Sequence, residues 1–294
     1  MQLNSPLGRH INETFTRFFN EDVRATSVTR VEGGDINQTF LLYTGKGKFF
    51  LKLNAALFGL DFFEKEGQGL AVLANAGALK VPRPLFDGKY HQQIYLVMEF
   101  LEKGNPAPDF WKDFGTSIAS LHRNTCEKFG FDSDNFIGKI PQRNKQYDHW
   151  SEFYAEQRIM PLVSKALQRH LLQESDGVMA EKLCSKLSSL LPEEKPALLH
   201  GDLWKGNFMS LDTGYAAIFD PAVYYGHREM DLAMTMLFGG FDASFYQAYQ
   251  DSFPRMPGFE ERVEIHQLYP LLVHLILFGG PYYQQVRNIL QKFS

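Results

Sequence analysis

The densest group of residues that could carry out chemistry lies in residues 197–210, with the sequence ALLHGDLWKGNFMS. His200, Asp202 and Asn207 lie here between two apolar runs. Asp220 follows Asn207 by thirteen residues, at the end of the apolar run YAAIF. Phosphoryl transfer needs such a set, because one carboxylate must orient or deprotonate the attacking hydroxyl while an amide oxygen and a second carboxylate hold Mg²⁺. The alternative is a polar surface loop in which the spacing is accidental.

A lysine and a glutamate earlier in the chain could complete this set. Lys52 lies in the apolar sequence KFFLKLN, on the strand face opposite Leu51. Glu66 lies at helical spacing from Leu70, on a face that we expect to be buried. Because burying either charge alone is costly, we expect Lys52 and Glu66 to form an ion pair rather than to be two unrelated surface charges.

Two adjacent glycines, Gly33 and Gly34, lie between two predicted strands. Glycines at such a turn let backbone N–H groups approach a phosphate closely, so the pair is a candidate nucleotide contact. The sequence is not a full G-x-G-x-x-G motif, and two glycines between strands also make an ordinary hairpin turn.

The elements that must position these residues begin with a strand-rich segment around one helix. The expected strands cover residues 26–31, 39–43, 48–53 and 95–101. The expected helix begins at Asp61 and Glu64, which have the D-x-x-E spacing of a helix cap, and it ends at Gly77.

The rest of the chain has a different character. Residues 102–108, EKGNPAP, are rich in glycine and proline and are predicted to form a linker. Helical periodicity dominates after them, except for short strands between residues 197 and 219. We therefore expect an α+β fold of two lobes. Residues 1–101 would form a small β-rich nucleotide-binding lobe with one key helix, and residues 102–294 a larger, mainly helical, catalytic and substrate-binding lobe.

Composition and charge narrow the class of partner. The formal net charge is -4 and there is no long basic run, which argues against nucleic acid or an anionic membrane. The apolar segment 268–280 contains Pro270 and His274 and is too short to span a bilayer, so we expect a buried helix. Cys126 and Cys184 lie in unrelated contexts and the amino terminus lacks a signal-peptide pattern, so we expect reduced thiols in a cytoplasmic protein.

The loop H-G-D-x-x-x-x-N, with an aspartate at this distance, resembles the aminoglycoside-phosphotransferase-like small-molecule kinases, which are relatives of the protein kinases. More narrowly, LLHGDLWKGN, FDPAVYYGHREMDLAMTMLFGGF and LFGGPYY resemble the fructosamine kinase (ketoamine kinase) family. The resemblance extends over nearly the whole chain. It implies a bilobal protein-kinase-like fold and ATP-dependent phosphorylation of the sugar C3 hydroxyl of ketoamines, the Amadori adducts of sugars with amines, in deglycation.

The resemblance also implies roles for the polar residues. Asp202 would be the catalytic base, and Asn207 and Asp220 would hold Mg²⁺. Lys52 would contact the α- and β-phosphates of ATP, and Glu66 would orient that lysine.

Further implied positions concern the nucleotide base and the acceptor. Backbone groups of Met98, Glu99 and Phe100 would form a hinge that binds adenine. Trp204 would stack on the sugar–amine substrate, with His200 beside it, because an apolar ring suits the face of a sugar. The same indole could equally serve ordinary packing.

The family pattern leaves some positions open and departs at others. Asp231 is implied to brace the catalytic loop by accepting backbone hydrogen bonds, whereas His227 and Arg228 could line the substrate site or lie in solvent. Lys205 stands where the family commonly has serine, and we expect it to be solvated. Asp35 stands near the place where several members carry a redox-sensitive cysteine, so redox switching by that route is not expected.

Two other functions remain open at this level. The first is a kinase of another small substrate, such as an aminoglycoside or choline, although an aminoglycoside enzyme should present a strongly acidic substrate region. The second is a nucleotide-binding pseudokinase, against which the presence of all five polar residues argues. The sequence does not distinguish fructosamine from ribulosamine substrates or free from protein-bound ones, and it leaves the oligomeric state open.

Overall fold

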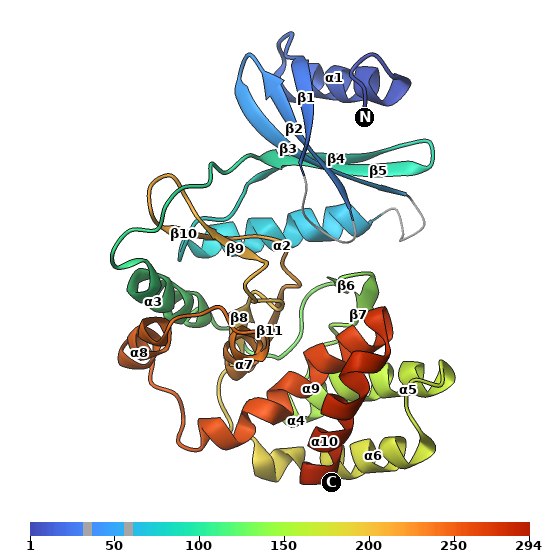
Figure 1. The fold of residues 1–294 in the computed structure, drawn as a ribbon, viewed down its shortest axis with the longest axis vertical. Helices are drawn as coiled ribbons and strands as arrows, with labels where there is room; N and C mark the ends of the chain where they lie inside the picture. Colours follow the sequence, from blue (N-terminus) through green and yellow to red (C-terminus); the bar gives the residue numbers. More distant parts are fainter. Residues whose placement is uncertain (32–36, 56–60) are drawn as a thin grey trace.

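The computed structural model describes residues 1–31, 37–55 and 61–294, and its amino-terminal part is built on an antiparallel five-stranded sheet (Figure 1). The strands are β1 (Ala25–Val31), β2 (Gln38–Thr44), β3 (Gly47–Ala55), β4 (Pro84–Tyr90) and β5 (Gln93–Glu99), in the spatial order β1-β2-β3-β5-β4. All four predicted strands are present, with ends that differ by one or two residues. The predicted glycine turn, Gly33 and Gly34, lies outside the described residues.

The fifth strand, β4, is not predicted by the sequence. Pro84, Asp87 and Gly88 interrupt any apolar alternation, and each is unfavourable inside a strand. The strand tolerates them because it lies at an edge of the sheet, where a missing backbone N–H leaves no ladder position unfilled.

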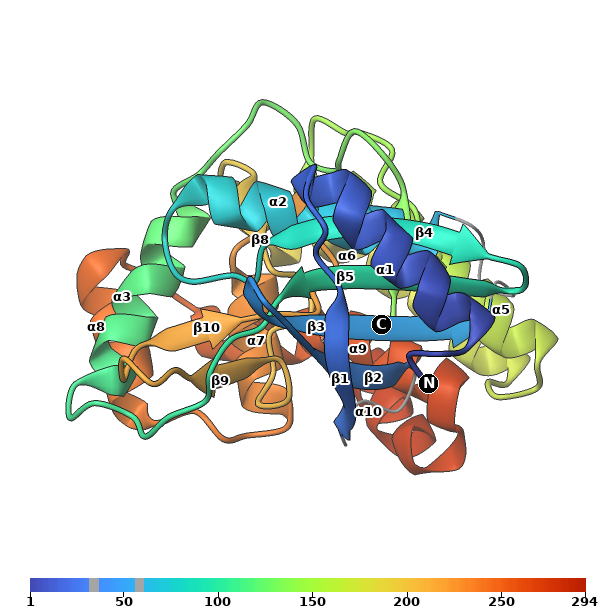
Figure 2. The ribbon, with the colours of Figure 1, turned by 90° about the horizontal axis from the view of Figure 1, so that it is seen from above.

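The sheet carries two helices, so the expectation of a single helix in this region is wrong. α1 (Pro6–Phe19) begins at Ser5, whose Oγ accepts the backbone N–H of Gly8 at 3.1 Å. α1 lies across the sheet in the view from above (Figure 2), and its buried Ile11 and Phe15 belong to the apolar cluster on that face. A serine N-cap followed by proline at the first helical position is a signal that the sequence does contain.

α2 (Phe62–Ala76) covers the opposite face of the sheet (Figure 1). The alternation of β5 explains both layers, because Tyr95 and Val97 join the cluster under α1 whereas Leu96 and Met98 join the cluster that includes α2. Lys52 of β3 lies on the α2 face, as its position in the strand predicts.

The predicted cap of α2 is only partly right. Asp61 occupies the N-cap position, but its side chain makes no capping hydrogen bond, and Glu64 instead accepts a bond from the Gln68 side chain at 3.0 Å. Gly77 ends the helix as predicted, with a φ of +66° that glycine adopts without strain.

The carboxy-terminal region is mainly helical. Its helices are α3 (Phe110–His122), α4 (Trp150–Phe153), the π-helix Tyr154–Ile159, α5 (Met160–Gln168), α6 (Glu174–Leu190), α7 (Glu229–Leu237), α8 (Ala243–Ser252), α9 (Phe259–Phe278), the 3₁₀ turn Gly280–Tyr282 and α10 (Tyr283–Phe293). Its strands form the pairs β6 (Asn135–Ile137) with β7 (Ile140–Gln142), β8 (Ala197–Leu199) with β11 (Tyr224–Gly226), and β9 (Phe208–Ser210) with β10 (Ala216–Ile218).

This arrangement confirms the predicted α+β fold of a β-rich amino-terminal part above a helical carboxy-terminal part (Figure 1). The predicted buried helix over residues 268–280 is the second half of α9, whose apolar side chains are largely buried. Across the described ranges, no helix combines the length and the apolar character needed to cross a membrane. The boundary between residues 101 and 102 stays a prediction.

Candidate active site

The loop that follows β8 is folded by a turn that only glycine can make. Gly201 has a φ of +82°, and a Cβ there would lie 2.0 Å from the carbonyl oxygen of Ala222. The backbone N–H of Ala222 donates to the carbonyl of His200 at 2.9 Å, and the N–H of Phe219 donates to the carbonyl of Asn207 at 3.0 Å. These bonds hold the segment after β10 against the loop.

Asp231, in the first turn of α7, anchors the same loop. Its carboxylate accepts the backbone N–H groups of His200 at 2.8 Å and Gly201 at 2.9 Å, and one oxygen lies 3.2 Å from Nε2 of His122. Burial acts to raise the pKa of Asp231, but the hydrogen bonds and the neighbouring histidines outweigh it and hold that pKa below its usual value. The group therefore stays ionised and fixes the turn.

His200 is part of this anchor, which corrects its predicted place at the substrate. Its side chain is completely buried, and burial lowers its pKa, so the ring is neutral at pH 7. Nδ1 accepts the backbone N–H of Asp202 at 3.2 Å, so Nε2 carries the proton and donates to the carbonyl of Phe219 at 2.9 Å. With both ring nitrogens occupied, His200 has nothing left to offer a substrate.

Asp202 lies beside Asn207, whose Nδ2 donates to Oδ2 of Asp202 at 3.0 Å and to its carbonyl at 2.9 Å. Burial raises the pKa of Asp202 to about 7; the bond from Asn207 opposes this shift and the charge of Asp220 adds to it. A carboxyl group with this pKa can accept a proton near neutral pH. Lys205, in the same loop, is exposed, as expected.

Lys52 joins the two halves of the site. The predicted ion pair is present, with Nζ of Lys52 2.5 Å from Oε1 of Glu66, and Nζ also pairs with Oδ1 of Asp220. Burial acts to lower the pKa of Lys52, but the two carboxylates raise it above its usual value, so the ammonium group stays charged. Asp220 has a φ of +56°, a left-handed conformation that costs a non-glycine residue about 1 kcal/mol and is common at functional sites.

The oxygen atoms of Asn207 and Asp220 fit a hard divalent cation. Asn207 makes its hydrogen bonds through Nδ2, so within the described part of the chain its Oδ1 has no protein partner, and the same holds for Oδ2 of Asp220. Amide and carboxylate oxygens are the ligands that Mg²⁺ prefers. The pair can therefore hold a magnesium ion.

Part of the predicted hinge, residues 98–100, makes hydrogen bonds and an ion pair within the protein. The backbone N–H of Glu99 donates to the carbonyl of Arg83 at 2.8 Å, and its carboxylate pairs with Lys80 at 2.6 Å. Neither group is therefore available to a nucleotide. Hydrogen bonds to adenine would then come from backbone groups of Met98 and Phe100 or from the Glu99 carbonyl.

Comparison with known proteins places this chain in a family. A sequence model described as fructosamine kinase matches residues 8–294. The chain belongs to the fructosamine kinase family. A protein of Synechocystis sp. named probable ketoamine kinase is 40% identical over 99% of both chains. The mouse protein named ketosamine-3-kinase is 36% identical over 89% of this chain and 93% of its own.

Solved structures agree with this assignment. A protein of Haemophilus somnus assigned as a fructosamine-3-kinase superposes with a TM-score of 0.87 at 27% identity, covering 96% of each chain. The aminoglycoside phosphotransferase APH(4)-Ia superposes with a TM-score of 0.60 at 16% identity, over 96% of this chain and 98% of its own, and so shows a shared fold. Family membership makes the protein a phosphotransferase that acts on a sugar hydroxyl.

In this fructosamine kinase family member, Trp204 begins a row of rings that the sequence patterns do not reveal. The indole packs over Gly206, where a Cβ would lie 2.3 Å from the ring, and its centroid is 5.9 Å from that of Phe238. The ring centroid of His274 lies 4.7 Å from that of Phe238 and 5.1 Å from that of Tyr282. The row joins the loop, the end of α7, α9 and the turn before α10, so only the tertiary structure assembles it.

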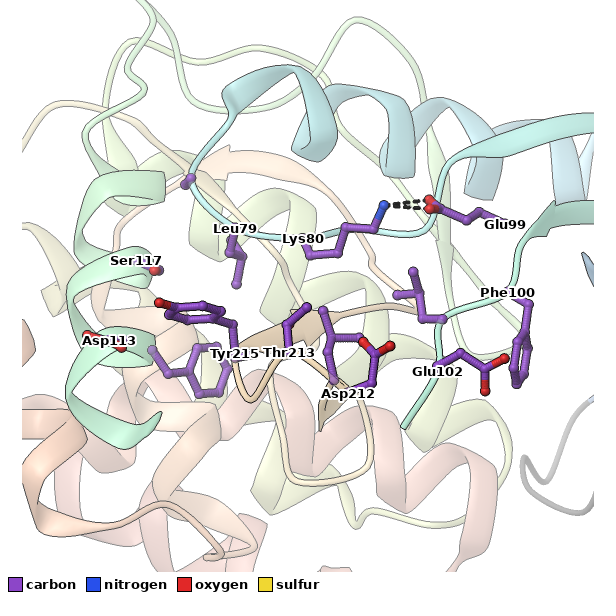
Figure 3. Close-up of a pocket in the computed structure, with 15 residues that line it drawn as sticks. Leu79, Lys80, Glu99, Phe100, Glu102, Asp113, Ser117, Asp212, Thr213 and Tyr215 are labelled. Carbon is purple, nitrogen blue, oxygen red and sulfur yellow. Dashed lines mark hydrogen bonds and ion pairs between the residues drawn. The ribbon is translucent and has the colours of Figure 1, made fainter. Parts of the chain in front are cut away.

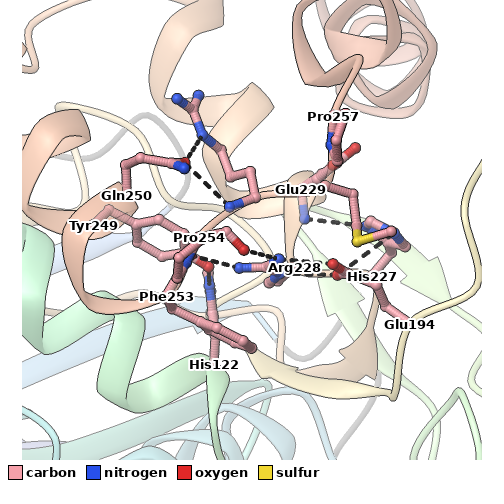
Figure 4. Close-up of polar contacts among 12 residues, drawn as sticks. His122, Glu194, His227, Arg228, Glu229, Tyr249, Gln250, Phe253, Pro254 and Pro257 are labelled. Atoms are coloured by element: carbon pink, nitrogen blue, oxygen red, sulfur yellow. Dashed lines mark hydrogen bonds and ion pairs between the residues drawn. The ribbon is translucent and has the colours of Figure 1, made fainter.

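His227 and Arg228 do not lie in solvent, because both are buried, and Figure 4 shows them in polar contacts with neighbouring residues. Arg228 forms two hydrogen bonds with the Glu194 carboxylate, at 2.7 and 2.8 Å, and its guanidinium lies 3.9 Å from the centroid of the Phe253 ring. His227 accepts the backbone N–H of Glu229 through Nδ1 at 3.3 Å. The two residues tie the start of α7 to the surrounding chain.

The buried cluster of His227, Glu229 and His266 has its potential metal-ligand atoms within 4.8 Å of one another. Two contacts argue against a metal there. Because Nδ1 of His227 accepts a backbone N–H, its Nε2 carries the proton and cannot ligate. Arg262 holds both carboxylate oxygens of Glu229, at 2.6 and 2.9 Å. The cluster therefore serves as structural support for α7.

Proposed function

We propose that this protein transfers the γ-phosphate of ATP to the C3 hydroxyl of a ketoamine and so acts as a ketosamine-3-kinase. The observation that carries the proposal is the meeting of Lys52 with both Glu66 and Asp220, next to an Asp202 whose pKa lies near neutrality. These groups come from β3, α2 and two loops, and they match the set that phosphoryl transfer needs.

In the proposed reaction, Asp202 accepts the proton of the acceptor hydroxyl as the phosphate is transferred. Asn207 holds the carboxylate of Asp202 in place through Nδ2 and presents Oδ1, together with Asp220, to Mg²⁺. The ion supplies positive charge to the phosphate oxygens when it is bound. Lys52 is kept charged and oriented by Glu66, so it can pair with the nucleotide phosphates.

The acceptor side of the proposal rests on the aromatic row. Trp204 is only two residues from Asp202, and its ring is partly exposed beside Phe238. An apolar ring next to the base suits the face of a sugar, and the amine part of the substrate would extend along the row toward His274. Asp231 takes no part in the transfer and holds the backbone that carries Asp202.

The setting of the reaction also belongs to the proposal. Cys126 and Cys184 are both free thiols, which fits a reducing compartment, so we place the enzyme in the cytoplasm. Its substrate is a ketoamine, either a free small molecule or a glycated amino group of a protein. Neither nucleic acid nor membrane enters the scheme.

The test is ATP consumption with Mg²⁺ against fructoselysine, ribuloselysine, kanamycin, choline and no acceptor. We expect turnover with the ketoamines alone, and phosphorus NMR should place the new ester on C3. Asp202→Asn, purified in parallel, controls for contaminating kinases. Turnover with kanamycin or choline but not with ketoamines would overturn the substrate assignment, and nucleotide binding without turnover on any acceptor would overturn the activity.

A further inference from the structure

A cavity lies beside the segment 99–102, which leads from β5 into the carboxy-terminal region (Figure 3). Its volume is about 560 Å³, within the range typical of small-molecule sites. The walls come from residues 78–80 after α2, the segment 99–102, α3, and the turn 211–216 between β9 and β10. The cavity therefore contacts both the β-rich and the helical parts of the protein.

This cavity does not contain the proposed catalytic and metal-binding residues. None of Lys52, Asp202, Asn207 and Asp220 lines it, although Glu99 and Phe100 of the predicted hinge do. The two sites nevertheless share backbone, because the N–H of Asp212 donates to the carbonyl of Glu102 at 3.0 Å, and the chain entering that turn is β9, which follows the catalytic loop directly. The cavity thus contains none of the proposed catalytic residues, but it adjoins the predicted hinge and the turn that follows β9.

The floor of the cavity is apolar and aromatic. Leu79, Leu101 and Phe114 contribute apolar surface. Tyr215 is 59% exposed, and Figure 3 shows its hydroxyl directed toward Ser117 on α3. An exposed tyrosine ring at a concave surface offers a face on which a flat or cationic group can stack.

Most of the charged groups that line the cavity are negative. Four carboxylates and one ammonium group, that of Lys80, line the cavity. Lys80 neutralises Glu99 at 2.6 Å, and Lys48, from outside, pairs with Glu102 at 2.5 Å.

The other two carboxylates, those of Asp113 and Asp212, are exposed, and within the described ranges neither forms an ion pair or a side-chain hydrogen bond. The cavity therefore keeps two carboxylates without an ion pair in the described ranges, one on α3 and one in the 211–216 turn, with the exposed ring of Tyr215 between them (Figure 3). This combination of charge and surface is complementary to a positively charged organic group.

We propose that this cavity is a ligand site for a small organic cation, an ammonium or guanidinium group on a short carbon chain. The cation pairs with Asp113 on α3 and packs on the Tyr215 ring, while its chain lies on the apolar lining, and Asp212 at the other end of the cavity adds to the negative potential (Figure 3). Charge complementarity selects the cation, and the volume of the cavity accommodates a small molecule rather than an extended polypeptide. The proposal does not depend on which acceptor the enzyme phosphorylates.

The test is an NMR titration of the ¹⁵N-labelled full chain with argininamide, and with citrullinamide as a neutral probe of nearly the same shape. We expect saturable binding of argininamide with a Kd of about 0.1–1 mM, typical for a ligand of this size. The amides that shift should lie in the four wall segments, and citrullinamide should not bind measurably. The double variant Asp113→Asn/Asp212→Asn should weaken binding at least tenfold, and Tyr215→Ala should weaken it about threefold.

Matched controls decide the outcome. Glu181→Gln removes one exposed carboxylate outside the cavity and should bind argininamide like the wild type. Equal binding of citrullinamide, or equal weakening by Glu181→Gln, would overturn the proposed charge recognition. The absence of saturable binding would overturn the site itself.

Two further measurements test the size of the occupant and the independence of the cavity from the active site. The blocked tripeptide Ala-Arg-Ala tests whether the true occupant is a basic side chain of a polypeptide, and tighter binding than that of argininamide would overturn the small-molecule assignment. Kinase turnover of the double variant should stay within twofold of wild type. A large loss of turnover would show that the cavity is not separate from the active site, whereas failed argininamide binding with normal turnover would leave the proposed kinase function standing.

Discussion

Asp202 and Asp231 both lie against the loop after β8, yet their surroundings shift their pKa values in opposite directions. Asp202 is half-buried, has one amide donor and lies near the negative charge of Asp220, so loss of hydration raises its pKa to about 7. Asp231 is buried with two backbone N–H donors and His122, so its pKa falls below its usual value. Loss of hydration acts on both carboxylates, and the hydrogen-bond donors and the signs of the neighbouring charges decide the direction of each shift.

The same contrast separates two regions of the molecule. Around Asp202 the polar groups are incompletely matched, since Asn207 and Asp220 each keep an oxygen without a protein partner in the described ranges. Around Asp231, at the start of α7, buried charges are paired, as Glu229 is with Arg262. The first region can therefore bind and exchange protons, while the second region holds it in place.

The largest expected effect comes from Asp202→Asn. Turnover should fall at least about 100-fold, because the variant loses a positioned base. The melting temperature at pH 8 should be equal to or above that of wild type. The reason is that the folded-state pKa of Asp202 lies above its usual value of 3.8, so wild type loses stability as pH rises from 3.8 to about 7, and the loss is complete at pH 8. Steady-state kinetics measures the turnover and calorimetry the melting temperature. A melting temperature several degrees below that of wild type would show that ionised Asp202 stabilises the fold, as Asp231 does.

The second prediction concerns the paired region. Glu229→Gln should reduce the free energy of unfolding by about 3 kcal/mol, because it leaves the buried Arg262 without its carboxylate. Urea denaturation measures this value. Glu264→Gln, which breaks an ion pair with Lys292 at the surface, is the matched control and should cost less than about 1 kcal/mol. Equal losses from the two variants would contradict the importance of burial.

The pH dependence of stability tests Glu229 again. Its pKa is shifted downward, whereas that of Asp202 is shifted upward, so the two residues change stability with pH in opposite directions. The neighbours of Glu229 lower its pKa from 4.5 to about 2, in spite of its burial. A lowered folded-state pKa stabilises the fold above pH 4.5, and this stabilisation is lost as pH falls from 4.5 toward 2. Wild type should therefore lose more stability than Glu229→Gln over this interval, and parallel curves would argue against the assignment.

A smaller effect is expected in the pH profile of turnover. Because the base must be deprotonated, kcat/KM should fall about tenfold for each pH unit below pH 7, where Asp202 becomes protonated. Rates between pH 5.5 and 8.5 at fixed ionic strength check this slope. A flat profile down to pH 5.5 would mean that Asp202 has an ordinary pKa in the working enzyme.

The smallest expected effect concerns the aromatic row. Trp204→Leu should raise KM for the ketoamine about three- to tenfold and leave kcat within about twofold, because a stacking platform contributes binding rather than chemistry. Tyr215→Leu removes another exposed ring outside the row and should change neither constant. A loss confined to kcat would instead make Trp204 a support for the catalytic loop.

Local periodicity was sufficient for much of this protein. Strand alternation places Lys52 on one face of β3, and helical spacing places Glu66 on the buried face of α2, so their ion pair follows from two short-range rules. The same rules identify four strands and the end of α2 at Gly77. α1 was within reach too, since Ser5 and Pro6 form a recognisable helix start.

The folded arrangement was needed to separate the roles of His200 and Asp202. They stand two residues apart with similar polarity, yet His200 is closed off by Phe219 while Asp202 remains a candidate base. Asp231, which fixes the loop between them, is about thirty residues further along the chain. The type of a side chain and its distance along the sequence from other polar residues determine which reactions it could take part in. The amino-acid sequence alone therefore identified which residues could do chemistry. Burial and hydrogen-bond partners come from distant segments, and for that reason it is the three-dimensional packing that selects which of these residues act and which hold the others in place.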